Sequence, residues 1–452
     1  MKKAIVLVDG EHYFPVIKAA LNSIERDLKY ELLAIVYIGG TEKITDETDL
    51  SSFGFPVIVD SDPLFGIKAA LLQYKPDLTI DLSDEPVVGY IERFKFASHI
   101  LKSGVAYLGA DFRFDPPVFH DVVNKPSISI IGTGKRVGKT AVSGYACRCL
   151  EKSGFSPLVV AMGRGGPEKP EVLEGRKLRI TPQFLLKASE EGKHAASDHY
   201  EDALMSRVTT IGCRRCGGGM AGSPFISNVL QGAHLANKLE GELVVFEGSG
   251  SALPPIKTDT KVIVIGAHQR LEYVGGYFGA YRLLISDFAI LTMCEEPMAN
   301  EEKIKSLEEI IKEINPDLNV IRTIFRPRPL QKIYGKRVLL AVTISSEMNT
   351  TLKNYLEDEY GCKVIGISNN LSNRPKLRED LERHKGNFSV LLTELKAASV
   401  DVVTKMGFQA GVEVVYMDNE PVVIGGEVEL KNIIIDLAKE SVKRFRERKE
   451  VG

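Results

Sequence analysis

A glycine-rich segment at residues 128–145 constrains this chain more than any other part of its sequence. An apolar run ends just before residue 132, a glycine-rich stretch follows, and a helical pattern begins near Lys139 and continues to Lys152. A strand, a glycine loop and a helix in this order suit phosphate, because backbone N–H groups can point inward and the helix N-terminus adds positive potential. Lys139 would reach the β- and γ-phosphates of a nucleotide, and the Thr140 hydroxyl would bind Mg²⁺. The predicted nucleotide-binding residues are Gly132, Thr133, Gly134, Lys135, Arg136, Val137, Gly138, Lys139 and Thr140.

This loop departs from the strict G-x-x-x-x-G-K-[ST] pattern, which requires glycine where the chain has Thr133. Residues 132–140 instead resemble the G-T-x-x-x-V-G-K-T loop of dethiobiotin synthetase and its relatives. The competing interpretation is an ordinary turn with a surface lysine, and the strand pattern and extra glycines favour phosphate binding over it. Lys139 is expected to be exposed in the loop and to contribute little to packing.

Length and charge narrow the class of protein. A chain of 452 residues exceeds what one core usually holds, so two or three domains are expected. The net charge of −2, with 44% hydrophobic residues, indicates a globular protein without a broad basic surface, which argues against nucleic acid as a partner. The first apolar run stops at Asp9, too short for a signal peptide or a membrane span, so a cytoplasmic protein without a membrane partner is expected. The absence of tryptophan and the many charged residues are compatible with a thermophile.

The first 125 residues alternate apolar strands with helical stretches. Strand patterns at residues 3–9, 32–38, 56–59 and 78–82 predict a parallel sheet covered on both faces, hence a Rossmann-like α/β domain over residues 1–125. Polar clusters at residues 9–12 and 81–85 end two of these strands, where a ligand site or simple turn chemistry explains them equally well. Arg113, in the link that follows, could bind a phosphate or pair with a neighbouring aspartate.

Two later glycine-rich segments carry arginines. Arg164 follows the strand pattern of residues 157–162 and could bind the γ-phosphate, with a flexible turn and a solvated arginine as the alternative. Arg214 and Arg215 precede a triple glycine, and together they predict an anion cradle for a substrate with several phosphates.

The same segment contains a C-x-x-C pair, Cys213 and Cys216. A structural zinc site needs four ligands, and no second C-x-x-C or H-x-x-x-H follows. His194 and His199 could complete a site, but buried or disulfide-linked cysteines are the favoured interpretation.

Glu247 ends the apolar strand pattern of residues 243–247 and is followed by Gly-Ser-Gly. A carboxylate at the end of a strand after a phosphate loop can bind Mg²⁺ directly or through water. This segment also resembles the E-G-x-G of dethiobiotin synthetase, which implies a P-loop NTPase domain of that type over residues 126–335. By the same resemblance, residues 292–298 are expected to lie beside the nucleotide base.

Residues 336–452 return to alternating strands and helices and predict a smaller C-terminal α/β domain. Lys396-Ala-Ala-Ser399, at a predicted helix start, could receive a phosphate, although an ordinary helix start is favoured. The expected fold class is therefore α/β throughout, with the phosphate loop in the central domain.

Several segments, taken as a set, resemble archaeal cyclic 2,3-diphosphoglycerate synthetase over the whole chain. They are Val8–Tyr13, Gly132–Thr140, Gly163–Pro167, Gly212–Gly219 and Glu247–Gly250. The resemblance implies a ligase that uses ATP and Mg²⁺ to close the two phosphates of 2,3-diphosphoglycerate into an intramolecular phosphoanhydride, with release of ADP and phosphate.

Such a reaction brings several anionic groups together, so catalysis becomes positioning and charge neutralisation. The predicted catalytic residues are Lys139, Arg164, Glu247, Arg214 and Arg215, and the predicted metal ligands are Thr140 and Glu247. Two other functions stay open: a different ring-closing synthetase of the dethiobiotin-synthetase type, and a P-loop ATPase acting as a switch on a protein partner. The expected partner is the small-molecule substrate, and a homodimer is one candidate assembly.

Overall fold

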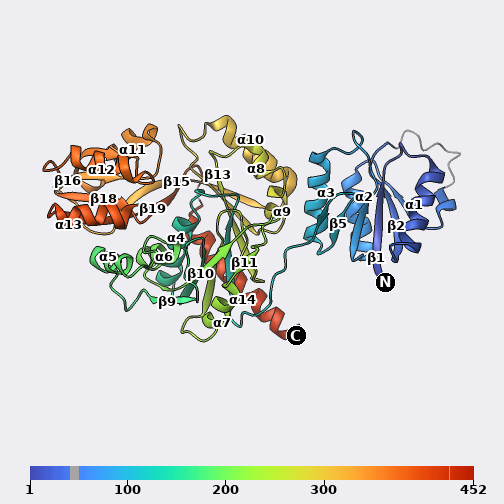
Figure 1. Ribbon diagram of the computed structural model, residues 1–452, viewed down its shortest axis with the longest axis horizontal. Coiled ribbons are helices and arrows are strands. Elements are labelled where there is room, and N and C mark those ends of the chain that lie inside the picture. The colour runs from blue at the N-terminus through green and yellow to red at the C-terminus, as the bar shows by residue number, and fades with distance from the viewer. Residues whose placement is uncertain (41–49, 427, 452) are drawn as a thin grey trace. The chain divides into compact units, whose positions relative to one another are not determined.

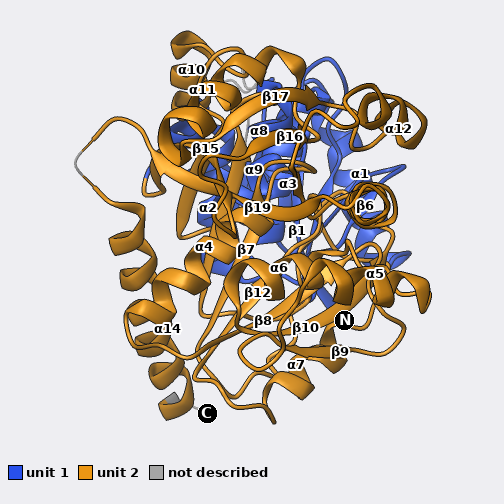
Figure 2. Ribbon diagram, turned by 90° about the vertical axis from the view of Figure 1, so that its left-hand side faces the viewer, with its two compact units in different colours: residues 1–118, 270–285, 310–316 blue, residues 119–269, 286–309, 317–452 orange. Residues whose placement is uncertain are grey.

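A computed structural model describes residues 1–40, 50–426 and 428–451 of the chain. Its contacts divide it into two compact units, coloured in Figure 2. Unit 1 comprises residues 1–118, 270–285 and 310–316, and unit 2 comprises residues 119–269, 286–309 and 317–452. Unit 1 therefore takes in two short segments that the predicted three-domain division assigned to the central domain. None of the helices in the described ranges is both long and apolar enough to cross a membrane.

Unit 1 is built on a six-stranded sheet in the order β3-β2-β1-β4-β5-β6. Its strands are β1 Lys2–Val8, β2 Tyr30–Tyr37, β3 Val57–Val59, β4 Leu78–Asp81, β5 Ala106–Leu108 and β6 Arg113–Phe114. Its helices are α1 Phe14–Arg26, the 3₁₀ turn η2 Leu50–Phe53, α2 Pro63–Tyr74, α3 Tyr90–Lys102, α8 Leu271–Val274 and α9 Gly279–Leu284. All neighbouring strands are parallel except β5 and β6, so the parallel sheet predicted from the continuous apolar runs is confirmed.

The sheet of unit 2 runs β11-β10-β8-β12-β7-β13-β14-β15-β19-β18-β16-β17, with β9 paired to β10. Figure 1 labels β15, β19, β18 and β16 of this sheet. The strands up to β15 are β7 Ser127–Gly132, β8 Pro157–Gly163, β9 Glu171–Glu174, β10 Thr209–Cys216, β11 Ile226–Ser227, β12 Leu243–Glu247, β13 Thr260–Gly266, β14 Phe288–Thr292 and β15 Asn319–Pro329. The later strands are β16 Arg337–Ala341, β17 Lys363–Ser368, β18 Val390–Glu394 and β19 Glu413–Val423. The strands from β10 across to β15 are parallel, whereas β15 pairs antiparallel with β19.

The helices of unit 2 alternate with the strands. They are α4 Lys139–Lys152, α5 Pro182–Glu190, α6 Asp198–Ser206, α7 Val229–Ala236, α10 Glu301–Ile314, the 3₁₀ turn η3 Ser346–Met348, α11 Asn349–Tyr360, α12 Arg374–Arg383, the π-helix η4 Ser399–Thr404, α13 Lys405–Gln409 and α14 Leu430–Val451. The last residues of α10 belong to unit 1. We call the strands β16 to β19 with α11, α12, η4 and α13 the C-terminal layer. Because β15 pairs with β19, this layer continues the sheet that carries the phosphate loop.

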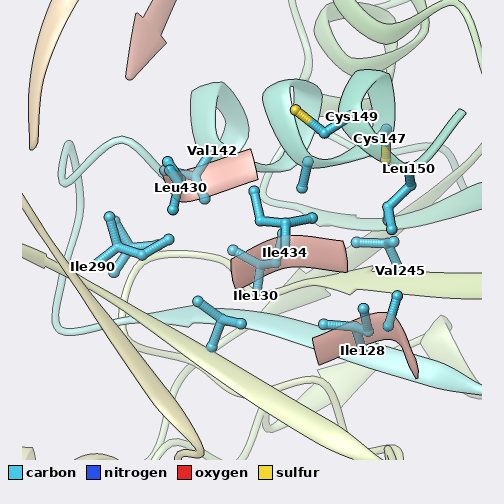
Figure 3. Close-up of a cluster of buried hydrophobic side chains, with 14 of the residues drawn as sticks. Ile128, Ile130, Val142, Cys147, Cys149, Leu150, Val245, Ile290, Leu430 and Ile434 are labelled. Carbon is cyan, nitrogen blue, oxygen red and sulfur yellow. The ribbon is translucent and has the colours of Figure 1, made fainter. Parts of the chain in front are cut away.

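The last helix, α14, completes the core around the phosphate loop (Figure 3). Its buried Leu430 and Ile434 pack with Val142 of α4 and with Ile128 and Ile130 of β7. The predicted division placed this helix in the C-terminal domain, and its sequence pattern gave only a charged terminal helix. Its apolar side instead covers the central strands next to α4.

A phosphate-loop site at the carboxyl ends of the strands

The glycine loop lies between β7 and α4, as its sequence predicts. Gly138 caps α4 with φ of +93°, a left-handed conformation that disfavours side chains. A Cβ atom at this position would lie 2.2 Å from Cζ of Phe325, so the phenyl ring packs directly on the glycine backbone. Both the backbone conformation and the lack of space therefore favour glycine here.

Lys139, the first residue of α4, is buried with 7% of its surface exposed. The expectation of an exposed lysine was wrong, because the loop folds back over the side chain and Nζ donates to the Gly134 carbonyl at 2.8 Å. Burial lowers the pKa of Lys139 to about 8, although the nearby Glu247 carboxylate opposes this shift. A buried ammonium held by one carbonyl gains strongly from an incoming phosphate.

Thr140 and Glu247 face each other across the loop. The Thr140 hydroxyl donates to Oε1 of Glu247 at 2.5 Å, and Glu247 ends β12, the strand next to β7 in the sheet. Glu247 is 2% exposed, and burial raises its pKa to about 6. Its Oε2 accepts no hydrogen bond from a described N–H or hydroxyl group, and the carboxyl group of Asp202 lies beside Glu247.

Helix α6 adds a group of acidic residues that the sequence analysis did not single out. Asp198, Glu201 and Asp202 are spaced to share one face of a helix, and Asp202 is completely buried beside Glu247. Burial and the Glu247 carboxylate raise the pKa of Asp202 well above its usual value, and burial raises that of Glu201 to about 8. Within the described ranges, neither carboxyl oxygen of Asp202 has a hydrogen-bond donor. The helical spacing was the available signal for this site.

Two of the predicted arginines converge on Gly250, three residues after Glu247. A Cβ atom at Gly250 would lie 2.6 Å from Nη2 of Arg164 and 3.3 Å from Nη2 of Arg215. Arg215 also donates to the carbonyls of Ser249, at 2.7 Å, and Gly217, at 3.2 Å. Burial, followed by the positive charge of Arg164, lowers the pKa of Arg215. The ends of β8, β10 and β12 thus bring two guanidinium groups together near the loop.

Arg214 is not part of this pair. It precedes Arg215 on β10, and successive side chains of a strand point to opposite faces. Arg214 is exposed, and its backbone N–H donates to Oδ1 of Asn228 at 2.6 Å. The segment predicted as one cradle is a strand up to Cys216, and this separates the two arginines.

The same alternation separates the C-x-x-C cysteines. Cys213 is buried, whereas Cys216 is exposed, and both are free thiols. The ring nitrogens of His199 are hydrogen-bonded to Ser197 and Glu171, and the ring packs against Gly212. Among the described residues there is no group of three or more His, Cys, Asp or Glu side chains that could hold a metal ion.

The remaining candidate residues are either exposed or paired with other side chains. Lys135 and Arg136 are exposed in the loop, and the Thr133 hydroxyl donates to Oε1 of Gln269. Arg326 forms a two-bond ion pair with Glu295, at 2.6 and 2.7 Å, in the segment expected beside the base. In unit 1, Arg113 pairs with Asp115, at 2.8 Å, which supports the ion-pair alternative.

The N-terminal polar clusters also meet, within unit 1. Asp9, which is fully buried, accepts from Nδ1 of His12 at 2.8 Å and from the backbone N–H of Asp84 at 2.7 Å. This joins the ends of β1 and β4 by hydrogen bonds that strand-ending turns alone would not require.

The oxygen atoms beside the loop suit a hard divalent cation. Mg²⁺ prefers carboxylate, hydroxyl and phosphate oxygens and usually keeps several waters, so few protein ligands are needed. Glu247 offers a buried carboxylate oxygen without a donor, next to the Thr140 hydroxyl. The residues present therefore fit Mg²⁺ in a site that a nucleotide phosphate would complete.

A parallel sheet, a glycine loop, a buried lysine and a helix N-terminus define a P-loop protein. The family model for the P-loop domain of cyclic 2,3-diphosphoglycerate synthetase matches residues 127–324. The models for the N-terminal and C-terminal domains of the same enzyme match residues 3–115 and 329–420. The chain belongs to the cyclic 2,3-diphosphoglycerate synthetase family.

Full-length relatives support the same family assignment. The cyclic 2,3-diphosphoglycerate synthetase of Methanothermus fervidus is 51% identical over 454 residues, covering 98% of each chain. That of Rubrobacter xylanophilus is 51% identical over 423 residues, covering 94% of this chain and 95% of the relative. A crystal structure of LpxK from Aquifex aeolicus in complex with ATP covers 79% of this chain and 96% of that chain, at 13% identity and a TM-score of 0.41. A score at that level is too low to support an argument.

Proposed function

We propose that this protein is an ATP-dependent ligase that closes 2,3-diphosphoglycerate into cyclic 2,3-diphosphoglycerate. The observation that carries the proposal is the convergence of Lys139, Arg164 and Arg215 beside Glu247, at the loop of a chain whose full-length relatives bear the name of this enzyme. A substrate with two phosphates, bound next to a nucleoside triphosphate, needs this concentration of positive charge.

Each residue has a distinct task in this proposal. Lys139 and the N-terminus of α4 bind the terminal phosphates of ATP, and the displaced Gly134 carbonyl releases the ammonium for them. Thr140 and Glu247 would hold Mg²⁺, which supplies charge neutralisation at the phosphate oxygens. Arg164 and Arg215 orient the substrate phosphates with forked hydrogen bonds, and the missing side chain of Gly250 leaves the space that their guanidinium groups occupy.

The proposed reaction balances in two phosphoryl transfers. An oxygen of one substrate phosphate attacks the γ-phosphorus of ATP, and the bond to the β-phosphate oxygen breaks to release ADP. An oxygen of the neighbouring substrate phosphate then attacks the inner phosphorus of the new diphosphate, the ring closes, and inorganic phosphate leaves. Both nucleophiles belong to the substrate, so the protein contributes position and charge rather than a nucleophilic side chain.

The test is ATP turnover with and without 2,3-diphosphoglycerate, with the product identified by ³¹P NMR. We expect ADP and phosphate to form in equal amounts only with the diphosphoglycerate, together with a cyclic phosphoanhydride. Lys139→Ala should abolish this turnover, because it removes the buried ammonium at the start of α4. Turnover without the diphosphoglycerate would favour a switch ATPase, and turnover only with a different carboxylate or carbamate substrate would favour another ring-closing synthetase.

Finer assignments also belong to this proposal. The spacing of Gly132–Thr140 and Glu247–Gly250 supports a loop domain of the dethiobiotin-synthetase type. The division into residues 1–125, 126–335 and 336–452, the homodimer and the cytoplasmic location stay predictions.

A further inference from the structure

An ion pair connects the C-terminal layer to the acidic helix α6. Lys396 lies two residues beyond the end of β18, and its Nζ is 3.2 Å from Oε1 of Glu201. The Glu201 side chain is buried, with 8% of its surface exposed, whereas the Lys396 side chain is 35% exposed. The carboxylate end of this pair is therefore shielded from water, and the ammonium end is partly solvated.

Glu201 occupies the same helical face as the two carboxylates nearest the phosphate loop. Asp202 lies beside Glu247, and Asp198 lies near Gly163, where its Oδ2 is 3.3 Å from the position of a Cβ atom. The placement of α6 therefore decides where these carboxylates stand relative to Thr140 and Glu247.

The apolar side of α6 packs against the C-terminal layer. Tyr200 and Ala203 share a buried cluster with Leu395, which precedes Lys396, and with Tyr416 of β19. The ion pair and the apolar contacts thus come from the same segment of the C-terminal layer and hold the same helix.

A second polar link ties this arrangement to the helix that follows the loop. Arg148 of α4 donates from Nη1 to Oδ2 of Asp418, at 2.6 Å, and to the carbonyl of Met205 in α6, at 3.2 Å. The phosphate-loop helix, α6 and the C-terminal layer are therefore fixed to one another by charged groups.

Four carboxyl groups gather at this point, because Asp198, Glu201 and Asp202 of α6 lie near Glu247. Burial and crowding disfavour negative charge on these carboxyl groups, and a nearby cation favours the charged form. Lys396 forms an ion pair with Glu201 of this group, and its charge opposes the rise in the pKa of Glu201.

We propose that Lys396 is a positioning residue for the ATP site: through Glu201 it holds α6, and with it Asp198 and Asp202, against the phosphate loop. The proposal rests on the function proposed above, since it concerns the binding of ATP at that loop. It gives the C-terminal layer a part in ATP binding although its own strands carry no phosphate loop.

The experiment measures the affinity of the full-length protein for a non-hydrolysable ATP analogue in the presence of Mg²⁺, by calorimetry, together with the thermal midpoint. Lys396→Met should weaken binding roughly tenfold or more, in the range seen when a group that orients a ligand site is removed, while the number of sites per chain stays near one. Lys396→Arg should restore most of the affinity. The matched control is Lys336→Met, which breaks the ion pair with Glu413 in the same layer and should leave the affinity unchanged.

A double variant tests whether Lys396 acts through Glu201. If it does, Glu201→Gln weakens binding, and adding Lys396→Met to that variant causes little further loss, because both changes break one contact. If the affinity losses of the two single variants multiply in the double variant, the proposal is overturned. An unchanged affinity in Lys396→Met would overturn it as well. A lower number of sites with unchanged affinity would show a role in folding alone and would also overturn it.

Two further outcomes would also decide between the proposal and its alternatives. If Lys396→Met does not fold, the isosteric Glu201→Gln variant decides alone, and wild-type affinity in that variant overturns the proposal. If the wild-type protein binds no ATP analogue, the proposed function itself fails, and this inference fails with it.

Discussion

The substrate role of Arg215 can be tested against its neighbour in the sequence. Replacing Arg215 by lysine keeps the positive charge but removes the guanidinium fork, whereas the same change at Arg214 alters an exposed side chain on the opposite face of β10. The two variants are therefore a matched pair, with equal charge and equal chemistry of substitution. Only one of them changes the group next to Arg164 and Gly250.

The expected magnitude follows from the hydrogen bonds of Arg215. Two of its N–H groups are held by the carbonyls of Ser249 and Gly217, and its buried Nε has no partner among the described residues. A lysine cannot make these bonds and also reach a phosphate. Loss of one hydrogen bond to a charged group costs about 1.5–3 kcal/mol. This corresponds to a rise of about 10- to 150-fold in the Michaelis constant for the diphosphoglycerate.

The assay is steady-state turnover with each substrate varied in turn, at saturating concentrations of the other. We expect Arg215→Lys to raise the Michaelis constant for the diphosphoglycerate and to change that for ATP little, and we expect Arg214→Lys to resemble the wild type. If the constant for ATP rises instead, Arg215 lines the γ-phosphate. Equal effects of the two variants would refute the reasoning from strand alternation.

Three further predictions concern other positions. Glu247→Gln should raise the Mg²⁺ concentration required for half-maximal activity by roughly tenfold or more, because a neutral amide is a poor Mg²⁺ ligand. The control is Glu242→Gln, which changes an exposed glutamate. A wild-type Mg²⁺ dependence of Glu247→Gln would exclude Glu247 from the metal site. Gly138→Ala should prevent ATP binding and lower the thermal midpoint, since a Cβ atom would collide with Phe325 at a φ of +93°, and normal ATP affinity in a folded variant would contradict this. In unit 1, burial lowers the pKa of His99 to about 4, so the unfolded chain binds a proton below about pH 6.5 that the folded protein does not. The free energy of unfolding should therefore fall by up to about 3 kcal/mol between pH 6.5 and pH 4, and a denaturant titration of His99→Leu should show a smaller loss over this range.

The sequence predicted the strands and the loop well because their signals are local. Continuous apolar runs mark strands buried on both faces, and a loop such as residues 132–140 needs glycines at fixed positions. The order of Glu247 after the loop also placed it correctly at the end of β12, next to β7. These features follow from neighbours in the chain, which a pattern can capture.

The errors arose where distant segments decide the environment. Lys139 is buried because its own loop folds back over it, and its charge lies near Glu247, which is far along the sequence. Asp202 is buried on α6, which shares an apolar cluster with distant residues of the C-terminal layer. Arg214 and Arg215 were predicted as one cradle since their segment was taken for a glycine-rich loop, while strand geometry extends through both.

The packing of α14 has a consequence for how the protein is made. Leu430 and Ile434 complete the core beside Ile128 and Val142, although almost three hundred residues separate the two segments (Figure 3). During synthesis the ribosome produces the phosphate loop long before this helix. One edge of β15 also stays unpaired until β19 has been synthesised. The nascent chain therefore exposes an apolar surface and an open strand edge until its last segments emerge. We expect synthesis that stalls before residue 413 to yield an aggregation-prone product that cannot assemble the ATP site.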